Sequence, residues 1–517
     1  LPNQGSSDLP GSNLTATGYI IDVAVAEIFL FNSSLLDFAL EPEAIIDQLN
    51  QALNASVDLL EGTLFFSLGG LPIIILWLLV GATYFTLRMG FINVRAFKHA
   101  IEVTLGRYDD PNEPGEVNHF QAIATALSAT VGLGNIAGVA IGLQLGGPGA
   151  VVWMTLAGFL GMSSKFVECT LAQQYRIVRE DGSIAGGPMY YLSQGLAKLG
   201  LRPLGRVLAG GFALLCAIGA LGGGNMFQAS QTQAAIAQVL PLFDRYPWGY
   251  GLILTGLVSL VIIGGIQRIG TVAGTIVPTM AGLYVMSGLW VIVCHLPAVP
   301  DAIVLITQEA FHPQAIEGGL VAVLVQGIRR GLFSNAAGVG SAAIAHAATR
   351  TQEPIREGLV ASLEPFIDTI VICNITALVC VVTNAYQTAP DTALRVELVA
   401  LAFGQAVSGF SLMLTVAVCL FAFSTIISWA YYGEQCWRYL TGDRWLLAYR
   451  LIYVAATFVG TVTQPGAVLA FSDMMLFAIA IPNLLGCLLL SNQVAVALKD
   501  YWQRLNAGKM PMHGIKI

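Results

Sequence analysis

Eleven apolar segments constrain the fold of this chain more than any other feature of its sequence. A helix needs about 20 mainly apolar residues to cross the hydrocarbon core of a bilayer. Of the 517 residues, 56% are hydrophobic and 11% are charged, so the sequence predicts an all-α polytopic membrane protein in contact with lipid. The expected spans cover residues 68–88, 120–145, 149–177, 206–240, 250–266, 271–296, 318–348, 357–384, 408–437, 446–464 and 466–497.

Charged side chains predict the orientation of these spans. Nineteen of the 24 Lys and Arg residues lie in alternate loops, at the adjoining helix ends and in the C-terminal tail, whereas the other loops hold only Arg245 and Arg395. Residues 1–67 contain nine acidic residues and no Lys or Arg. Under the positive-inside rule, we expect an extracytoplasmic segment (1–67), a transmembrane domain (68–497) and a cytoplasmic tail (498–517) in the cell (inner) membrane.

A glycine-rich stretch interrupts the second expected span. Val131–Gly138 (VGLGNIAG) lies in the middle of this span, and its three glycines and one asparagine disfavour a continuous helix. A break frees backbone N–H and C=O groups, which a membrane protein tolerates only where they face protein or a water-filled cavity. The stretch therefore indicates a ligand site, and close helix packing through glycine is the alternative.

A second copy of the motif favours the ligand site. Asn335–Gly340 (NAAGVG) repeats Asn135–Ala140 (NIAGVA), again near the middle of an apolar span. When the first span is set aside as a peripheral helix, the broken helices are the first and sixth of the remaining ten. Two halves of five helices must have opposite orientations, which is the 5+5 inverted repeat of the LeuT-type fold. Corresponding broken helices of this kind indicate the binding site of a secondary transporter.

Motifs along most of the chain resemble those of the sodium:alanine (alanine or glycine:cation) symporter family. They are Val131–Val139 (VGLGNIAGV), Leu145–Val151 (LGGPGAV), Gly186–Tyr191 (GGPMYY), Arg330–Asn335 (RGLFSN), Phe366–Thr369 (FIDT), Phe423–Glu434 and Ile481–Leu484 (IPNL). The resemblance implies the LeuT-type fold and sodium-coupled transport of a small amino acid. Two differences lie in the broken segments, where the family usually has Thr in place of Leu133 and Glu in place of Ala336. They bear on the substrate more than on the fold.

Backbone groups freed by the breaks can hold a zwitterionic amino acid. N–H groups around Leu133, Gly134 and Asn135 can donate to its carboxylate, and the helix dipole adds to these bonds. Carbonyl groups near Phe333 and Ala336 can accept from its ammonium. Val131–Asn135 (VGLGN) also resembles the first broken helix of the more distant neurotransmitter:sodium symporters, which share the fold. This resemblance implies a substrate site of Thr130, Leu133, Gly134, Asn135, Gln228, Phe333, Ala336 and Trp429, with Trp429 as its cap. The alternatives are an inter-helix hydrogen bond for Gln228 and ordinary packing for Trp429.

Hydroxyl and carbonyl oxygens suit sodium, which is a hard cation. Ser424 and Thr425 place two hydroxyls in an apolar span, and the alternative is that both bond to the preceding turn of their own helix. The resemblance implies a sodium site that comprises Ser128, Val131, Phe421, Ser424 and Thr425. A second sodium site would comprise Thr130, Asn135, Ser334 and Asn374.

Several charged residues also fall inside the expected spans. Arg329 and Arg330 precede the second break, and because Arg is costly against lipid, we expect both in a water-filled vestibule. One of them can pair with Asp473 as an outer gate. Lys165 and Glu168 stand three residues apart and are expected to pair with each other.

The function that these features predict is sodium-coupled symport of a small neutral amino acid, alanine or glycine, by alternating access. The alternatives are a proton-coupled carrier of the same fold and a carrier of a different small zwitterionic solute. An enzyme is disfavoured because the sequence has no nucleophile placed with a base and no metal motif such as HExxH. A channel is disfavoured because a broken-helix site in an inverted repeat fits alternating access. The sequence also lacks the basic patch of a nucleic-acid-binding protein.

Overall fold

The computed structural model describes residues 66–68, 71–312, 319–388, 395–406, 409–463 and 465–512, with a few isolated positions between 48 and 57. The chain divides into two units, Leu1–Ala52 and Leu53–Ile517. The expected extracytoplasmic segment 1–67 lies almost entirely outside the described residues, and so does the end of the tail beyond residue 512. Elements β1 to α25 belong to the second unit.

Helices make up nearly all of the second unit. The first part comprises α3 (Ile73–Arg88), α4 (Ile92–Arg95), α5 (Phe97–Thr104), α6 (His119–Thr130), η1 (Gly134–Gly138), α7 (Val139–Gly146), α8 (Ala150–Gln174), α9 (Pro188–Tyr190), η2 (Tyr191–Gly195), α10 (Leu196–Lys198), α11 (Arg202–Leu221), η3 (Gly222–Met226) and α12 (Phe227–Val239). Two short antiparallel strand pairs, β1 (Ser67–Leu68) with β2 (Leu71–Pro72) and β3 (Ile177–Val178) with β4 (Ile184–Ala185), accompany them.

The second part of the unit is also mainly helical. Its helices are α13 (Leu242–Arg245), α14 (Pro247–Ile262), α15 (Gly265–Cys294), η4 (Leu296–Ala298), α16 (Val299–Phe311), α17 (Gly319–Asn335), α18 (Ala342–His346), α19 (Pro354–Pro365), η5 (Phe366–Cys373), α20 (Asn374–Val382), α21 (Ala385–Thr388), α22 (Arg395–Ala406), α23 (Phe410–Thr441), η6 (Asp443–Trp445), α24 (Leu446–Val462) and α25 (Pro465–Asn506).

Seven helices in the described part of the chain are long and apolar enough to cross a membrane, and the bent pair of α6 and α7 adds an eighth span. The other three expected spans fall on shorter helices. These are α3 and α14, with 16 residues each, and α17, with 17 residues before the second break. The chain is therefore an all-helical polytopic membrane protein, and the count of eleven spans stays a prediction. The expected loop 385–407 contains two short helices, α21 and α22.

The first expected break lies between α6 and α7. A capping box begins α6, in which the Asn118 side chain accepts from the Gln121 N–H and the Gln121 side chain accepts from the Asn118 N–H. The α-helix ends at Thr130, and the chain continues through the π-helix η1 with a bend of 52°. The bend takes the N–H groups of residues 132–134 out of the regular helix ladder, as the glycine pattern predicts.

The second expected break separates α17 from α18. After Asn335, the residues Ala336, Gly338 and Gly340 have positive φ values of 49°, 83° and 88°. Glycine adopts this conformation readily, whereas alanine does so at a cost. A Cβ atom at Gly340 would also lie 2.7 Å from the Asn483 side chain of α25. The two broken helices are neighbours, because α17 packs against both η1 and α7.

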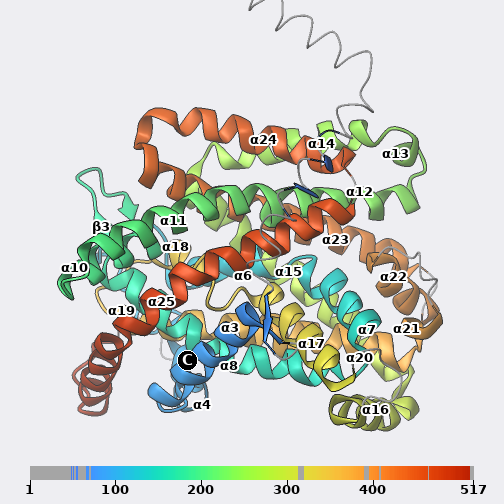
Figure 1. Cartoon of the computed structure of the whole chain (residues 1–517), viewed down its shortest axis with the longest axis horizontal. Coiled ribbons are helices and arrows are strands. Elements are labelled where there is room, and N and C mark those ends of the chain that lie inside the picture. Colours follow the sequence, from blue (N-terminus) through green and yellow to red (C-terminus); the bar gives the residue numbers. More distant parts are fainter. Residues whose placement is uncertain are drawn as a thin grey trace, which may run out of the picture. The chain divides into compact units, whose positions relative to one another are not determined.

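Contacts between the two five-helix groups are reciprocal. When α3 is set aside, α8 packs along α19, α11 along α23 and α14 along α24, so helices at the same position in each half meet. The contact of α11 with α25 is matched by the contact of α15 with α23. Figure 1 shows one such pair, α14 and α24, side by side. This reciprocity is the pattern that the expected inverted repeat, with its pseudo-two-fold axis, would produce.

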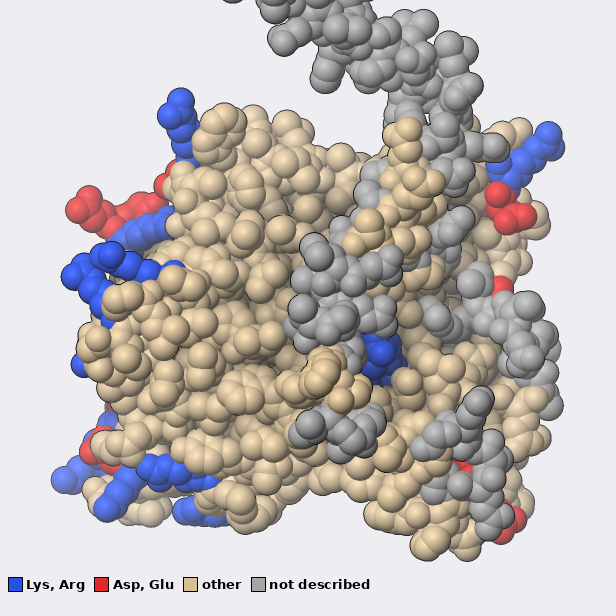
Figure 2. Space-filling model, in the orientation of Figure 1, with Lys and Arg blue, Asp and Glu red and all other residues tan. Residues whose placement is uncertain are grey.

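Lys and Arg side chains gather at one end of the second unit. Figure 2 shows them along the left edge, where Figure 1 places α10, β3 and the end of α25. A broad band of uncharged residues lies beside them, and apolar side chains such as Leu260 of α14 and Met286 of α15 are exposed. A lipid-facing apolar surface with cations at one end is the distribution that a bilayer favours.

Candidate functional site

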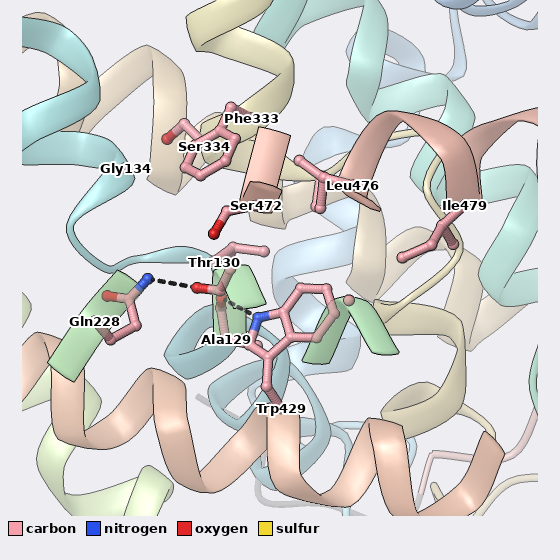
Figure 3. Close-up of a pocket in the computed structure, with 13 residues that line it drawn as sticks. Ala129, Thr130, Gly134, Gln228, Phe333, Ser334, Trp429, Ser472, Leu476 and Ile479 are labelled. Atoms are coloured by element: carbon pink, nitrogen blue, oxygen red, sulfur yellow. Dashed lines mark hydrogen bonds between the residues drawn. The ribbon is translucent and has the colours of Figure 1, made fainter. Parts of the chain in front are cut away.

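The two breaks border a narrow cavity, in which the centre of a water-sized sphere can occupy about 30 Å³. Figure 3 shows Trp429 of α23 on one side of this cavity and Phe333 and Ser334 of α17 on the other. Six of the eight expected substrate-binding residues line it, whereas Leu133 and Asn135 do not. The lining residues are Ala129, Thr130, Gly134, Gly219, Gly223, Gln228, Phe333, Ser334, Ala336, Trp429, Ser472, Leu476 and Ile479.

Backbone N–H groups of the first break are only partly satisfied by the protein. The Gly132 N–H donates to Asn135 Oδ1 at 2.9 Å, and the Leu133 N–H makes a long bond of 3.4 Å to Gln228 Oε1. The N–H of Gly134, which lines the cavity, has no acceptor among the described residues. It lies at the start of the continuous η1–α7 helix, where backbone donors and the helix dipole favour an anionic group.

The second break contributes an aromatic ring and one backbone carbonyl to the cavity. The Ala336 N–H donates to the Leu332 carbonyl at 2.9 Å, and the Ala336 carbonyl accepts a long bond of 3.3 Å from the Val339 N–H. The Phe333 ring meets the Phe227 ring edge-on, with the ring centroids 5.9 Å apart. Phe333 therefore forms an apolar wall, and the Ala336 carbonyl keeps a lone pair for a further donor.

Trp429 is held rigidly against the cavity. Its Nε1 donates to the Ala129 carbonyl at 3.0 Å, and its ring meets that of Tyr432 edge-on with the centroids 5.5 Å apart. The indole also lies against Gly224, where an added Cβ atom would fall 2.2 Å from the indole Cγ. An indole fixed in this way sets the dimensions of one side of the cavity.

Four oxygen atoms converge where the expected sodium ligands of α6 and α23 meet. Thr425 Oγ1 lies 2.9 Å from both the Ser128 carbonyl and the Phe421 carbonyl. Ser424 Oγ lies 2.9 Å from the Phe421 carbonyl and 3.5 Å from the Ser128 carbonyl. Both hydroxyls therefore bond to the preceding turn of their own helix, as the alternative interpretation of the sequence expects. Hydroxyl and carbonyl oxygens are also the ligands that a hard cation prefers, so the sodium site stays a prediction. Val131, the fifth expected ligand, is buried, and its N–H bonds to the Leu127 carbonyl at 2.6 Å.

The residues expected for a second sodium site divide into three places. Asn135 and Ser334 meet on one carboxylate, that of Asp368, which accepts from Asn135 Nδ2 at 2.7 Å and from Ser334 Oγ at 2.7 Å. Asn374 is instead bonded by the Thr155 hydroxyl, at 3.0 Å. Thr130 is not part of either group, because its hydroxyl donates to the Ala126 carbonyl at 3.2 Å and its side chain lines the cavity.

The sequence reasoning did not single out Asp368, which bonds to two of the residues expected for the second sodium site. It is fully buried in η5, and the Thr369 hydroxyl donates to its second oxygen at 2.7 Å. The carboxylate thereby joins both broken helices to the α19–α20 segment through Asn135 and Ser334. The signal was available, because an acidic residue inside an apolar span indicates a functional site by default.

One face of α25 was also missed. Ser472, Leu476 and Ile479 line the cavity at positions i, i+4 and i+7, the spacing of residues that share a helix face. Nothing in their types separates Leu476 and Ile479 from the other apolar residues of α25. Only the polar pair of Ser472 and Asp473 distinguishes this part of the helix in the sequence.

Both arginines before the second break pair with the same carboxylate. Asp473 Oδ2 accepts from Arg329 Nη2 at 2.7 Å and from Arg330 Nη2 at 2.5 Å, so α17 and α25 are linked beside the cavity. The expected pair of Lys165 and Glu168 has a separation of 3.9 Å, but Glu364 of α19 lies closer to the Lys165 ammonium, at 3.0 Å. The i+3 spacing identified one partner, and the tertiary partner could not be read from it.

Comparisons with known proteins agree on the family. The family model described as "Sodium:alanine symporter family" matches residues 51–514. The sodium/alanine symporter AgcS of Methanococcus maripaludis is 39% identical over 432 residues, which cover 83% of this chain and 94% of that protein. The probable sodium/glutamine symporter GlnT of Bacillus subtilis is 35% identical over 444 residues, 85% of this chain and 90% of that protein.

A solved structure supports the fold. The crystal structure of MhsT in complex with L-phenylalanine aligns with a TM-score of 0.51 at 12% sequence identity, over 73% of this chain and 88% of that chain. At this identity the likeness speaks for the architecture alone. It confirms the expected LeuT-type fold.

Proposed function

The chain belongs to the sodium:alanine symporter family, and on that premise we propose that it carries alanine or glycine together with sodium by alternating access. Membership makes it a transporter and not an enzyme. The observation that carries the proposal is the cavity between the two breaks, which offers a free N–H at Gly134 and a carbonyl lone pair at Ala336. A small zwitterion presents the complementary carboxylate and ammonium.

The walls of the cavity support a small side chain. Trp429 and Phe333 bring two rings to it, and Leu476 and Ile479 add apolar side chains from α25. A relative is named as a probable glutamine symporter, so larger substrates belong to the alternatives. Leu133, where the family usually has Thr, is fully buried and does not line the cavity. The Leu133 side chain therefore affects substrate binding indirectly, through the position of the backbone in the first break.

Sodium fits the proposal as a transported substrate bound between α6 and α23. The Ser128 and Phe421 carbonyls and the Ser424 and Thr425 hydroxyls would hold the ion. These residues join the first broken helix to α23, which also carries Trp429, so ion and substrate share two structural elements. A shared pair of elements is a route for the reciprocal coupling that symport requires.

A substrate panel in proteoliposomes tests the function. Uptake of alanine, glycine, valine, leucine and glutamine would be measured with an inward sodium gradient, with an inward proton gradient and with neither. We expect saturable uptake of alanine or glycine with sodium alone, and exchange of internal for external substrate. Uptake driven only by protons, or preference for glutamine, would contradict the proposed coupling or substrate, and flux without saturation would favour a channel.

Replacing Trp429 by Ala should enlarge the range of substrates. An extra methylene is discriminated by only about 1–3 kcal/mol in an apolar pocket, so exclusion by a fixed indole is the stronger means of rejecting larger side chains. Trp429→Ala is expected to raise valine or leucine uptake relative to alanine about tenfold or more. Trp437→Ala is the matched control, because Trp437 lies on the same helix outside the cavity. Unchanged selectivity in Trp429→Ala would assign the indole to packing.

The proposed orientation places the N-terminal segment outside and the C-terminal tail in the cytoplasm. In a background without the eight native cysteines, Lys509→Cys in sealed cells should resist a membrane-impermeant thiol reagent. Asp244→Cys is the matched control. Asp244 is exposed in α13, in the loop 241–249 that is expected outside the membrane, so a cysteine there should react. Reaction at position 509 but not at 244 would reverse the orientation.

A further inference from the structure

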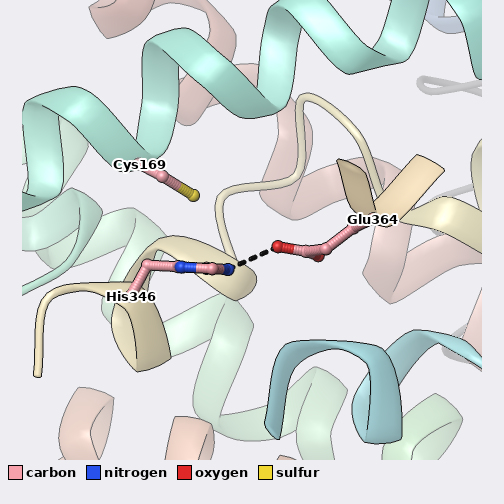
Figure 4. Close-up of side chains that lie close together, drawn as sticks. All are labelled: Cys169, His346 and Glu364. Carbon is pink, nitrogen blue, oxygen red and sulfur yellow. Dashed lines mark hydrogen bonds and ion pairs between the residues drawn. The ribbon is translucent and has the colours of Figure 1, made fainter. Parts of the chain in front are cut away.

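A row of buried ionisable groups lies outside the cavity, where α6, α8, α18 and α19 meet. We call Asp109, His119, Glu357, His346, Glu364 and Lys165 the buried proton row. All except Asp109 are at most 1% exposed. His346 of α18 contacts Glu357 through Nδ1 and Glu364 through Nε2, the latter at 2.5 Å. Figure 4 shows the His346 ring directed at Glu364, with Cys169 of α8 beside them.

The hydrogen count at His346 demands an ionisable proton. An ionised carboxylate only accepts hydrogen bonds, and a neutral imidazole has a single N–H. Because both ring nitrogens of His346 face carboxylate oxygens, the pair of contacts requires one proton more than neutral His346 with two carboxylates can supply. Either His346 is an imidazolium or one of the two glutamates is protonated. With this proton present, both nitrogens of the His346 ring make hydrogen bonds, and both bonds join α18 to glutamates of α19.

The same count argues against a metal ion at this place. Cys169, His346 and Glu364 have ligand atoms within 4.8 Å of one another, which is close enough for a shared cation. Both His346 nitrogens are already engaged by carboxylates, and the Lys165 ammonium lies 3.0 Å from Glu364. A metal would have to displace a hydrogen bond and lie beside a fixed positive charge, so the proton is the cation that this geometry accommodates.

The row leads to water at Asp109, on which Arg350 and Arg356 also act. Glu357 contacts His346 with one oxygen and His119 Nδ1 with the other. His119 Nε2 and Asp109 Oδ1 face each other at 3.7 Å, and neither atom has a hydrogen-bond partner in the described part of the chain. The Asp109 side chain is 32% exposed. A proton can therefore pass from His346 through Glu357 and His119 to Asp109 and the solvent.

The other end of the row reaches the second break. Lys165 lies between Glu364 and Glu168, and Asn483 Nδ2 donates to Glu168 at 3.0 Å and to the Gly338 carbonyl at 2.8 Å. Other charged or titratable groups act on the row from neighbouring elements. They are Cys169 of α8, Arg176 just after α8 ends, Arg350 and Arg356 near Asp109, and Tyr432 of α23 near Glu364. Protonation within the row is thus linked by direct contacts to the backbone of the second break at Gly338.

We propose that the buried proton row is a proton-binding site, open to the inner solution, whose proton holds α18 against α19 and is released when the second break moves in the transport cycle. On release, the proton leaves His346 through Glu357 and His119 to Asp109. His346 then has one N–H for two carboxylates, so the contact between α18 and α19 loosens. The inner proton concentration therefore controls the carrier, in addition to the sodium and substrate gradients.

Uptake at varied inner pH tests the proposal with purified full-length chain in proteoliposomes. The outer solution stays near neutrality, and the inner pH is varied from about 5 to 9, which includes the range of about 5 to 8 in which histidine ordinarily titrates. We expect sodium-driven alanine uptake to change about three- to tenfold over the transition of a single proton site. His346→Gln keeps a hydrogen-bond donor that does not titrate and should remove this dependence. His99→Gln, at a buried histidine bonded to Tyr501 outside the row, is the matched control and should retain it.

A second measurement needs neither variant nor uptake. Wild-type protein in weak buffer with a pH-indicator dye should exchange about one proton per chain when sodium, or sodium and alanine, is added. Sodium-driven alanine uptake with no response to inner pH and no proton exchange would overturn the proton site and leave the proposed function intact. Proton exchange on sodium addition without alanine uptake would support the site and contradict the substrate. Equal pH dependence in wild type and in a folded His346→Gln variant would also overturn the proposal.

Discussion

The double replacement of Ser424 and Thr425 by Ala is expected to weaken sodium binding about 100-fold or more, because a hydrogen-bond-type contact to a charged partner contributes about 1.5–3 kcal/mol and two are lost. Both hydroxyls lie 2.9 Å from the Phe421 carbonyl, at the meeting point of α6 and α23. Alanine has the highest helix propensity, so α23 should persist. By reciprocal linkage, substrate affinity should fall most at limiting sodium and recover at saturating sodium.

Substrate binding to purified protein, titrated at several sodium concentrations, measures this effect. The matched control is the double replacement of Thr83 and Thr86 by Ala on the peripheral helix α3, where both hydroxyls bond to the preceding turn at 2.8 Å. The control should bind sodium and substrate as wild type does. A folded Ser424/Thr425 variant with wild-type sodium dependence would exclude this cation site, and the proton-coupled alternative would then be the better explanation of transport.

The broken helices could be predicted from the sequence because their cause is local. Glycine and asparagine in Val131–Gly138 disfavour a helix wherever the segment lies, and the copy at Asn335–Gly340 also contains one Asn and two Gly residues. Apolar length and the Lys and Arg distribution are local properties as well. Six expected substrate residues line one cavity. They lie in or next to these two broken segments, or on helices that the LeuT-type fold places beside them.

The contacts between distant helices could not be predicted in this way. Asp368 bonds to Asn135 across 233 positions of the chain, and His119 meets Glu357 across 238 positions. Periodicity on one helix tells which residues share a face, but it does not tell which helix that face meets. The i+3 rule therefore found Glu168 for Lys165 and missed Glu364, the closer partner. Buried charges in apolar spans remain the signal that would have marked these residues.

Replacing Asp473 by Asn should open the outer side of the cavity. The Asp473 carboxylate is 2% exposed, and both Arg329 and Arg330 of α17 contact it, so its loss removes the anion that the two guanidinium groups share. Removing one partner of a buried ion pair costs about 3–5 kcal/mol, which corresponds to a shift of more than about 100-fold between closed and open forms. Hydration of the arginines stabilises the open form, because water replaces the lost carboxylate.

Two measurements follow from a gate that stays open. Sodium-driven uptake should fall at least about tenfold, because alternating access requires closure. Leu476→Cys, placed on the cavity wall, should react faster with an impermeant thiol reagent from outside when Asp473→Asn is also present. Glu434→Gln is the matched control, because it removes the carboxylate of a partly buried pair with Arg450, bonded at 2.6 Å and away from the cavity. If Asp473→Asn transports normally and position 476 reacts no faster than in the control, the pair of arginines with Asp473 joins α17 to α25 without gating the site.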